Sequence, residues 1–134
     1  MLTSKLEQNF HPISTEDKIK LEAVFNQVNN ILCRQLDNVK LTFSSRDNKS
    51  YYGMYYFSPR REIVIYPHRD ISGKIATLLH ECVHALDRTN QHGHDRWFWY
   101  NLGILTERVK MAVLDAIPDN IDIETSINSL MEKK

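Results

Sequence analysis

Apolar residues recur at spacings of three and four in the first part of the chain, from Leu21 to Leu36. This spacing places one apolar stripe on a helix, which we expect over residues 15–37. Ser14 stands before the stripe as the expected N-cap, and two acidic residues follow in the first turn, where they favour a helix N-terminus. Residues 1–13 lack the pattern, and we expect them to form an extended leader.

The pattern then changes to the period of a β-strand. Residues 39–43 alternate between apolar and polar side chains, as on a half-buried strand. The aromatic-rich stretch 51–57 and the stretch 62–66 (EIVIY) are the expected second and third strands. Because only a short turn separates these two stretches, we expect them to form a hairpin.

Helical spacing returns in the second half of the chain. We expect one helix over residues 71–88 and another over residues 95–116, with a turn at 89–93 between them. Residues 119–134 are the expected C-terminal helix or tail. The order of elements predicts a single α+β domain over residues 1–134, with an N-terminal helix, a small three-stranded sheet and then helices.

Composition and charge narrow the class of protein. Hydrophobic residues make up 42% of the 134 residues and charged residues 25%, as in ordinary globular domains. The net charge is zero, so the chain lacks the electrostatic footprint of a dedicated nucleic-acid binder. No apolar run is long enough to span a membrane and no signal peptide is apparent, so we expect a cytoplasmic protein. Cys33 and Cys82 are expected to be free, buried thiols.

Metal chemistry is indicated within residues 77–99 (TLLHECVHALDRTNQHGHDRWFW). His80, Glu81 and His84 form an HExxH pattern on an expected helix, where residues four apart lie on the same face. Neutral imidazole is a good ligand for zinc. Glu81 neighbours the first ligand and can reach a water molecule on the ion, from which it can take a proton as a general base.

A catalytic zinc ion commonly has three protein ligands and one open position, so a third ligand is needed. His92 and His94 both follow across the turn. We favour His94, because Gly93 before it allows the chain to reverse direction, but His92 stays an alternative. Asp87 is within reach of a ligand imidazole as a second-shell hydrogen-bond partner, although a surface charge is an equally good interpretation.

HECVH, followed by Gly93-His94-Asp95-Arg96-Trp97-Phe98, resembles the SprT/Spartan-like zinc metalloproteases. That family combines an HExxH helix, a short variable loop, a Gly-His pair and an aromatic residue four positions after that histidine. The resemblance extends over about residues 15–110 and implies a minimal zincin-like fold. Asp95 stands where the family often has a small residue.

The resemblance also implies a site and a function. His80, His84 and His94 would bind Zn²⁺, and Glu81 would be the catalytic base of a zinc metallopeptidase. Family members are associated with the cleavage of proteins crosslinked to DNA, which implies a protein or peptide substrate and DNA as a further partner. No cysteine follows Cys82, so we expect only the catalytic core, without the family's zinc ribbon, as in a bacterium or a phage-infected cell.

A second class of function stays open, namely a zinc-stabilised, non-catalytic module that binds DNA or protein. The presence of Glu81 favours the enzyme. Substrate-binding residues cannot be assigned, but two features are candidates. One of the strands at 51–57 and 62–66 can pair with an extended substrate as an exposed edge. A basic group can contact nucleic acid, and its members are Arg60, Arg61, His68, Arg69 and Lys74.

Overall fold

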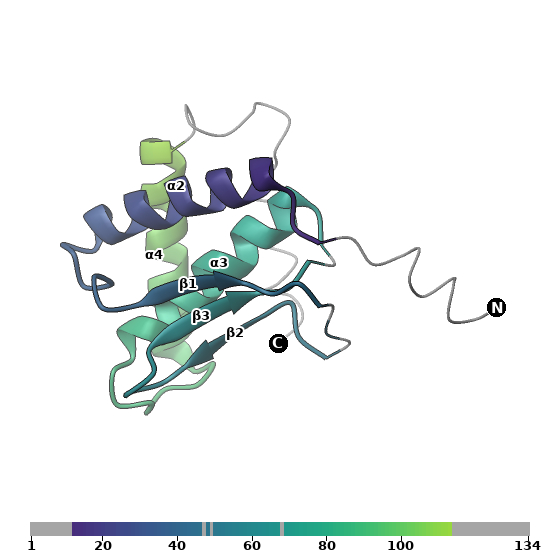
Figure 1. Ribbon diagram of the computed structural model, residues 1–134. Helices are drawn as coiled ribbons and strands as arrows, with labels where there is room; N and C mark the ends of the chain where they lie inside the picture. The colour runs from purple at the N-terminus through teal and green to yellow at the C-terminus, as the bar shows by residue number, and fades with distance from the viewer. Residues whose placement is uncertain (1–11, 47, 49, 68, 114–134) are drawn as a thin grey trace.

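The computed structural model describes residues 12–46, 48, 50–67 and 69–113 (Figure 1). The described elements, in chain order, are α2 (Thr15–Ile31), β1 (Lys40–Phe43), β2 (Gly53–Tyr56), β3 (Glu62–Ile65), α3 (Ile71–Leu86) and α4 (Arg96–Val113). Three helices and one three-stranded sheet confirm the predicted small α+β fold. None of the described helices is both long enough and apolar enough to cross a membrane.

The strand order in the sheet is β1-β3-β2. β2 and β3 form the predicted antiparallel hairpin, in a register that pairs Gly53 with Ile65 and Tyr56 with Glu62. β1 pairs with β3 in parallel. β3 is therefore the central strand, and all four of its residues are buried, which explains its nearly continuous apolar sequence. β2 is left at an edge of the sheet.

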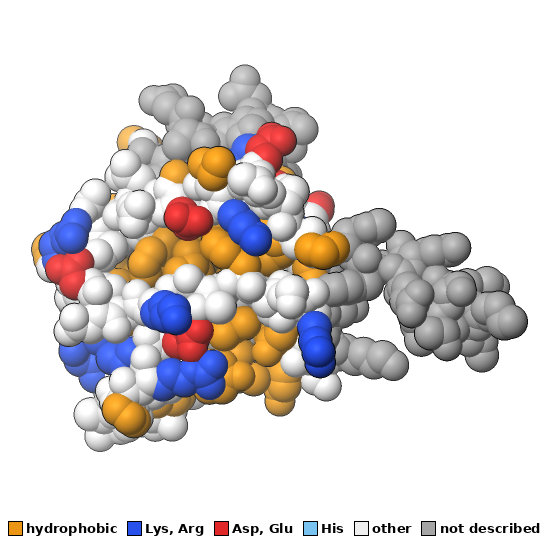
Figure 2. All heavy atoms as spheres, in the orientation of Figure 1, with side chains coloured by type: hydrophobic (Ala, Val, Ile, Leu, Met, Phe, Trp, Pro, Cys, Tyr) orange, Lys and Arg blue, Asp and Glu red, His pale blue; other side chains and the backbone are white. Residues whose placement is uncertain are grey.

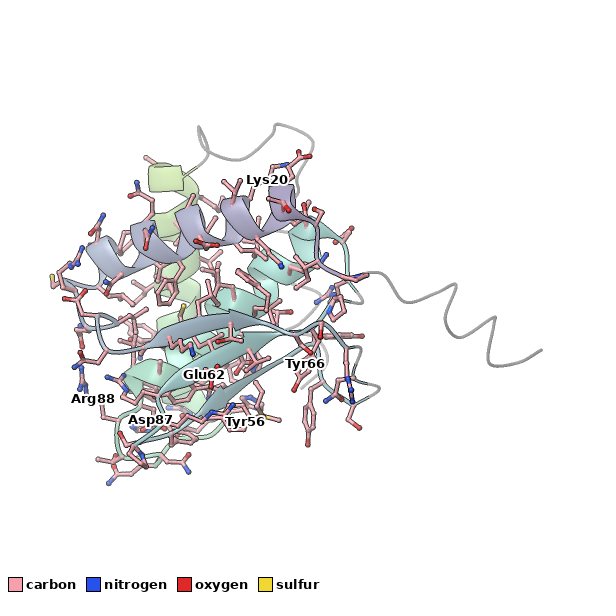
Figure 3. The ribbon with its side chains drawn as sticks, viewed as in Figure 1. Lys20, Tyr56, Glu62, Tyr66, Asp87 and Arg88 are labelled. Atoms are coloured by element: carbon pink, nitrogen blue, oxygen red, sulfur yellow. The ribbon has the colours of Figure 1, made fainter. Side chains whose placement is uncertain are left out.

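The helices form a layer on one side of the sheet (Figure 1). α3 packs against β2 and β3, while α2 and α4 pack against α3 and against each other. Because side chains alternate along a strand, those of the register partners Tyr56 and Glu62 lie on the face of the sheet that is turned away from the helices (Figure 3). The largest fully buried side chains are Phe98, Leu21, Leu36, Ile63, Ile65, Ile75, Leu78, Leu79, Leu102, Val24 and Val28.

The first helix ends earlier than the apolar spacing predicts. α2 stops at Ile31, because Cys33 and Arg34 adopt left-handed backbone angles, with φ of 54° and 66°, that a right-handed helix cannot contain. The side-chain oxygen of Asn29 accepts a hydrogen bond from the Leu36 backbone N–H at 2.7 Å and fixes the turn. Leu36 is buried in the core although it lies beyond the helix, so its apolar side chain did not indicate that the helix ends at Ile31.

The remaining boundaries differ by a few residues. The expected strand 51–57 is shortened to Gly53–Tyr56, and the helix expected over 71–88 ends at Leu86. Ser14 is the N-cap as predicted, and its hydroxyl accepts from the Asp17 N–H at 3.1 Å. Cys33 is exposed, contrary to expectation, while Cys82 is buried. The expected C-terminal helix or tail and most of the leader lie outside the described residues.

Candidate metal centre

α3 carries the first part of the candidate site. Its N-cap is Asp70, whose carboxylate accepts from the Gly73 N–H at 2.8 Å. Most of the helix is buried, and its apolar side chains fix it against the sheet and against the other two helices. His80 and His84 lie one turn apart on α3 and are only partly buried, so their rings are available at the surface of the helix.

The structure brings His80, His84 and His94 together. Their Nε2 atoms form a nearly regular triangle, with separations of 3.2 Å between His84 and His80, 3.0 Å between His84 and His94, and 3.1 Å between His94 and His80. A tetrahedral ion with Zn–N distances of about 2.0–2.1 Å separates its ligand nitrogens by about 3.3–3.4 Å. The three nitrogens could therefore hold one metal ion, with small adjustments.

The protonation of these rings suits a cation. Burial, followed by repulsion from the neighbouring histidines, lowers the pKa of His80 to about 3. Burial is also the main reason why the pKa of His84 falls to about 4. Both imidazoles are therefore neutral at pH 7, which is the form that binds metal. His80 Nδ1 is buried without a hydrogen-bond partner among the described residues.

Phe98 supports all three imidazoles. Its side chain is fully buried, and its ring centroid lies 4.8 Å from that of His80, 4.5 Å from that of His84 and 4.9 Å from that of His94. Phe98 is the aromatic residue four positions after His94. This contact with every ring of the triangle gives a physical reason for an aromatic residue at that spacing.

The loop between α3 and α4 positions the third imidazole. Gly93, which we expected to let the chain reverse direction, has a φ of 57°, a left-handed conformation that glycine adopts readily. The buried carboxylate of Asp87 accepts hydrogen bonds from the backbone N–H groups of Gln91 at 3.1 Å and His92 at 2.8 Å. Asp87 therefore holds the loop backbone, and it acts on the site through the loop that carries His94.

His92 lies outside the triangle. Its Nδ1 is 2.9 Å from a carboxylate oxygen of Asp95, and its ring stacks on that of Trp97 with a centroid distance of 4.3 Å. The other carboxylate oxygen of Asp95 accepts from the Phe98 N–H at 3.1 Å, as an N-cap does at the start of α4. Asp95 thus holds His92 away while it fixes Phe98. Sequence reasoning did not find this role.

Glu81 is buried beside the triangle and lines the same cleft. Burial raises the pKa of its carboxyl group to about 8. Gly53 on β2 makes this close packing possible. A Cβ at that position would lie 2.5 Å from Thr77 Cγ2, 3.1 Å from the Val64 carbonyl oxygen and 3.5 Å from Glu81 Cγ. The single glycine in this aromatic-rich strand was the available signal for this close approach.

The cleft has two compartments that meet at the site. Both are lined by Tyr51, Gly53, His80, Glu81 and His94. The larger compartment, of about 370 Å³, lies toward the start of α3 and is completed by Ser50, Tyr52 and Thr77. The smaller, of about 260 Å³, lies toward the end of α3 and is completed by Met54, Tyr55, Phe57, His84, Asn90 and Gly93.

The described basic residues around the hairpin all make contacts within the fold, while His68 lies outside the described residues. Arg60 is paired with Glu62 at 2.6 Å, and Arg61 donates to the Ala85 carbonyl oxygen at 2.9 Å. Arg69 lies over the Tyr52 ring, at 4.6 Å from its centroid. The buried Lys74 is paired with an aspartate of α2. On the face seen in Figure 2, basic, acidic and hydrophobic side chains are interspersed.

Comparison with known proteins adds no assignment, because no family model and no curated protein matches the chain. The geometry itself defines three histidines that could hold a metal ion, with a buried carboxyl group beside them in an open cleft.

Proposed function

We propose that the chain is a zinc-dependent endopeptidase of the SprT/Spartan-like kind. His80, His84 and His94 hold Zn²⁺ in this proposal, and Glu81 is the general base. The observation that carries it is the Nε2 triangle with sides of 3.0–3.2 Å, which shares its cleft with the buried Glu81 carboxyl group. The residues present fit the ion in type, number and spacing.

When bound, zinc polarises the scissile carbonyl group and makes water more acidic. Glu81 takes the proton of the attacking water and passes it to the leaving nitrogen. Burial raises the pKa of Glu81 to about 8 in the metal-free protein. Glu81 would ionise more readily beside a cation held by the three histidines, because a nearby positive charge favours the carboxylate form that accepts a proton.

The position of β2 supports a polypeptide substrate. β2 is an edge strand, and Gly53, Met54 and Tyr55 line the cleft. An extended peptide can pair with such an edge through main-chain hydrogen bonds. Compartments on both sides of the site leave room for substrate residues before and after the scissile bond, which favours an endopeptidase.

DNA-associated proteins are the substrates that the family resemblance suggests. The internal pairing of Arg60, Arg61 and Lys74 gives no independent support to a DNA contact at the hairpin. We therefore propose protein or peptide segments as the substrate class.

The alternative is a zinc-stabilised module without catalysis. Structural zinc sites are commonly closed by four protein ligands, whereas catalytic sites keep a position open. The described residues bring together three metal-ligating side chains, and Glu81 lines the cleft beside them instead of joining the group. This arrangement favours the enzyme.

The test combines metal content with peptide cleavage. We expect about one zinc ion per chain in the wild type and in His92→Ala, and its loss in His94→Ala, by mass spectrometry. We expect Glu81→Gln to retain zinc while the cleavage of an unfolded protein falls by about 10²–10⁴-fold. Full turnover in Glu81→Gln would contradict the proposed mechanism, and a metal-free wild type would remove its basis.

A further inference from the structure

The smaller compartment of the cleft has an apolar character. Met54, Tyr55 and Phe57 contribute to its wall on the sheet side, and Asn90 and Gly93 border it on the loop side. Among the described residues, its ionisable lining side chains are tyrosines, Glu81 and the three histidines of the site, with no lysine, arginine or aspartate. A charged side chain placed here would lose water without gaining an ionic partner beyond the site itself.

The wall formed by Phe57 is held in place from behind. The Phe57 and Tyr55 rings meet edge to face, with centroids 4.9 Å apart and planes at 77°. The Tyr55 hydroxyl accepts a hydrogen bond from Arg61 Nε at 3.1 Å, and Arg61 also donates to the Ala85 carbonyl oxygen near the end of α3. The pocket is therefore formed before any ligand arrives, which reduces the entropy lost on binding.

The direction of β2 indicates which part of a substrate reaches this compartment. β2 begins at Gly53, next to Thr77 and Glu81, and continues toward Phe57 and the end of α3. Antiparallel pairing is the more stable of the two strand pairings. A substrate paired antiparallel with β2 therefore has its N-terminal part over Tyr55–Phe57 and its C-terminal part over the tyrosines before Gly53.

We propose that this compartment binds the apolar side chain of the substrate residue just before the scissile bond, and that Phe57 is a specificity-determining residue. The inference rests on the proposed peptidase function and names its substrate class, which is peptide segments with a leucine, methionine or phenylalanine at that position. The larger compartment, lined by Ser50, Tyr51, Tyr52 and Thr77, receives the residue after the bond.

The experiment is the digestion of a peptide library by the zinc-loaded full chain, with the cleavage sites read by mass spectrometry. We expect leucine, methionine and phenylalanine to exceed aspartate and lysine before the cut by at least about tenfold. Phe57→Leu should change the ratio of phenylalanine to leucine at that position, and Phe57→Lys should raise the share of aspartate and glutamate. Zinc content and circular dichroism report whether each variant is folded.

Phe43→Leu is the matched control. Phe43 is also a partly buried phenylalanine, but it lies on β1 and does not line either compartment. We expect its cleavage profile to match the wild type. Cleavage without a preference before the cut, a preference only after it, or equal changes in Phe57→Leu and Phe43→Leu would overturn the inference and leave the peptidase intact. No cleavage of any peptide by the zinc-loaded wild type would overturn the proposed function as well.

Discussion

Phe98 links the hydrophobic core to the three histidines of the proposed metal site, so its removal should affect stability and metal binding together. Its fully buried ring lies 4.5–4.9 Å, between centroids, from each of the three imidazoles. Phe98→Ala leaves a cavity beneath all three, and such a change in a core costs about 3–5 kcal/mol. That is a large share of the roughly 5–15 kcal/mol by which domains of this size are stable.

Leu105→Ala is the control that separates the loss of stability from the loss of metal binding. Leu105 is nearly as buried as Phe98 and lies on the same helix, about 10 Å further along its axis. Its truncation should cost about 2–5 kcal/mol of stability without disturbing the imidazoles. Phe98→Ala should in addition weaken zinc binding by about 10–100-fold, the range found when groups that orient metal ligands are lost.

Two measurements decide whether Phe98 is only a core residue or also supports the three imidazoles. Urea unfolding in the presence of a chelator gives the stability of the metal-free variants, and competition with a chromophoric chelator gives the zinc affinity. If Phe98→Ala and Leu105→Ala lose stability to a similar extent and bind zinc equally well, Phe98 is only a core residue, and the reasoning about the imidazole platform is refuted.

Two further predictions concern carboxylates outside the triangle. Asp87→Ala should lower zinc affinity by about 10–100-fold, because the loop carrying His94 loses two backbone hydrogen bonds. In a competition with a chelator, the zinc affinity of Asp87→Asn should lie between those of the wild type and Asp87→Ala. Equal affinities in all three proteins would contradict the role of the loop. The hydrogen bond from Thr42, and then that from Arg60, lower the pKa of Glu62 from its usual value of 4.5. Because the pKa of Glu62 is depressed in the folded state, its ionisation stabilises the fold above pH 4.5, and this stabilisation is lost as the pH falls through the folded pKa. Glu62→Gln should therefore reduce the pH dependence of the urea unfolding midpoint between pH 6 and pH 3. Parallel pH profiles for the wild type and Glu62→Gln would disprove this prediction.

The local pattern of the sequence was sufficient for several features. The spacing of His80 and His84 puts them on one face of a helix, because the α-helical repeat alone fixes that relation. The Ser14 cap and the β2–β3 hairpin also depend on residues close together in the chain, and both are confirmed. Gly93 indicated the reversal that leads into His94, and its backbone there has a positive φ of 57°.

The other features of the fold and of the site depend on contacts between residues that are distant in the sequence, so only the tertiary structure decided them. The parallel pairing of β1 with β3, the closeness of Gly53 to Thr77 and the support of three imidazoles by Phe98 are not encoded in any local spacing. The ion pair of Lys74 has the same origin, because Lys74 meets Asp17 across 57 positions of the chain.

The third histidine of the triangle shows both contributions at once. The sequence reduced the choice to His92 and His94, since each follows the HExxH helix across a short turn. The folded loop then separated them, because Asp95 and Trp97 hold His92 while the His94 ring lies on Phe98. The sequence by itself thus determined the kinds of side chain and their order, and only packing in three dimensions decided which of them meet.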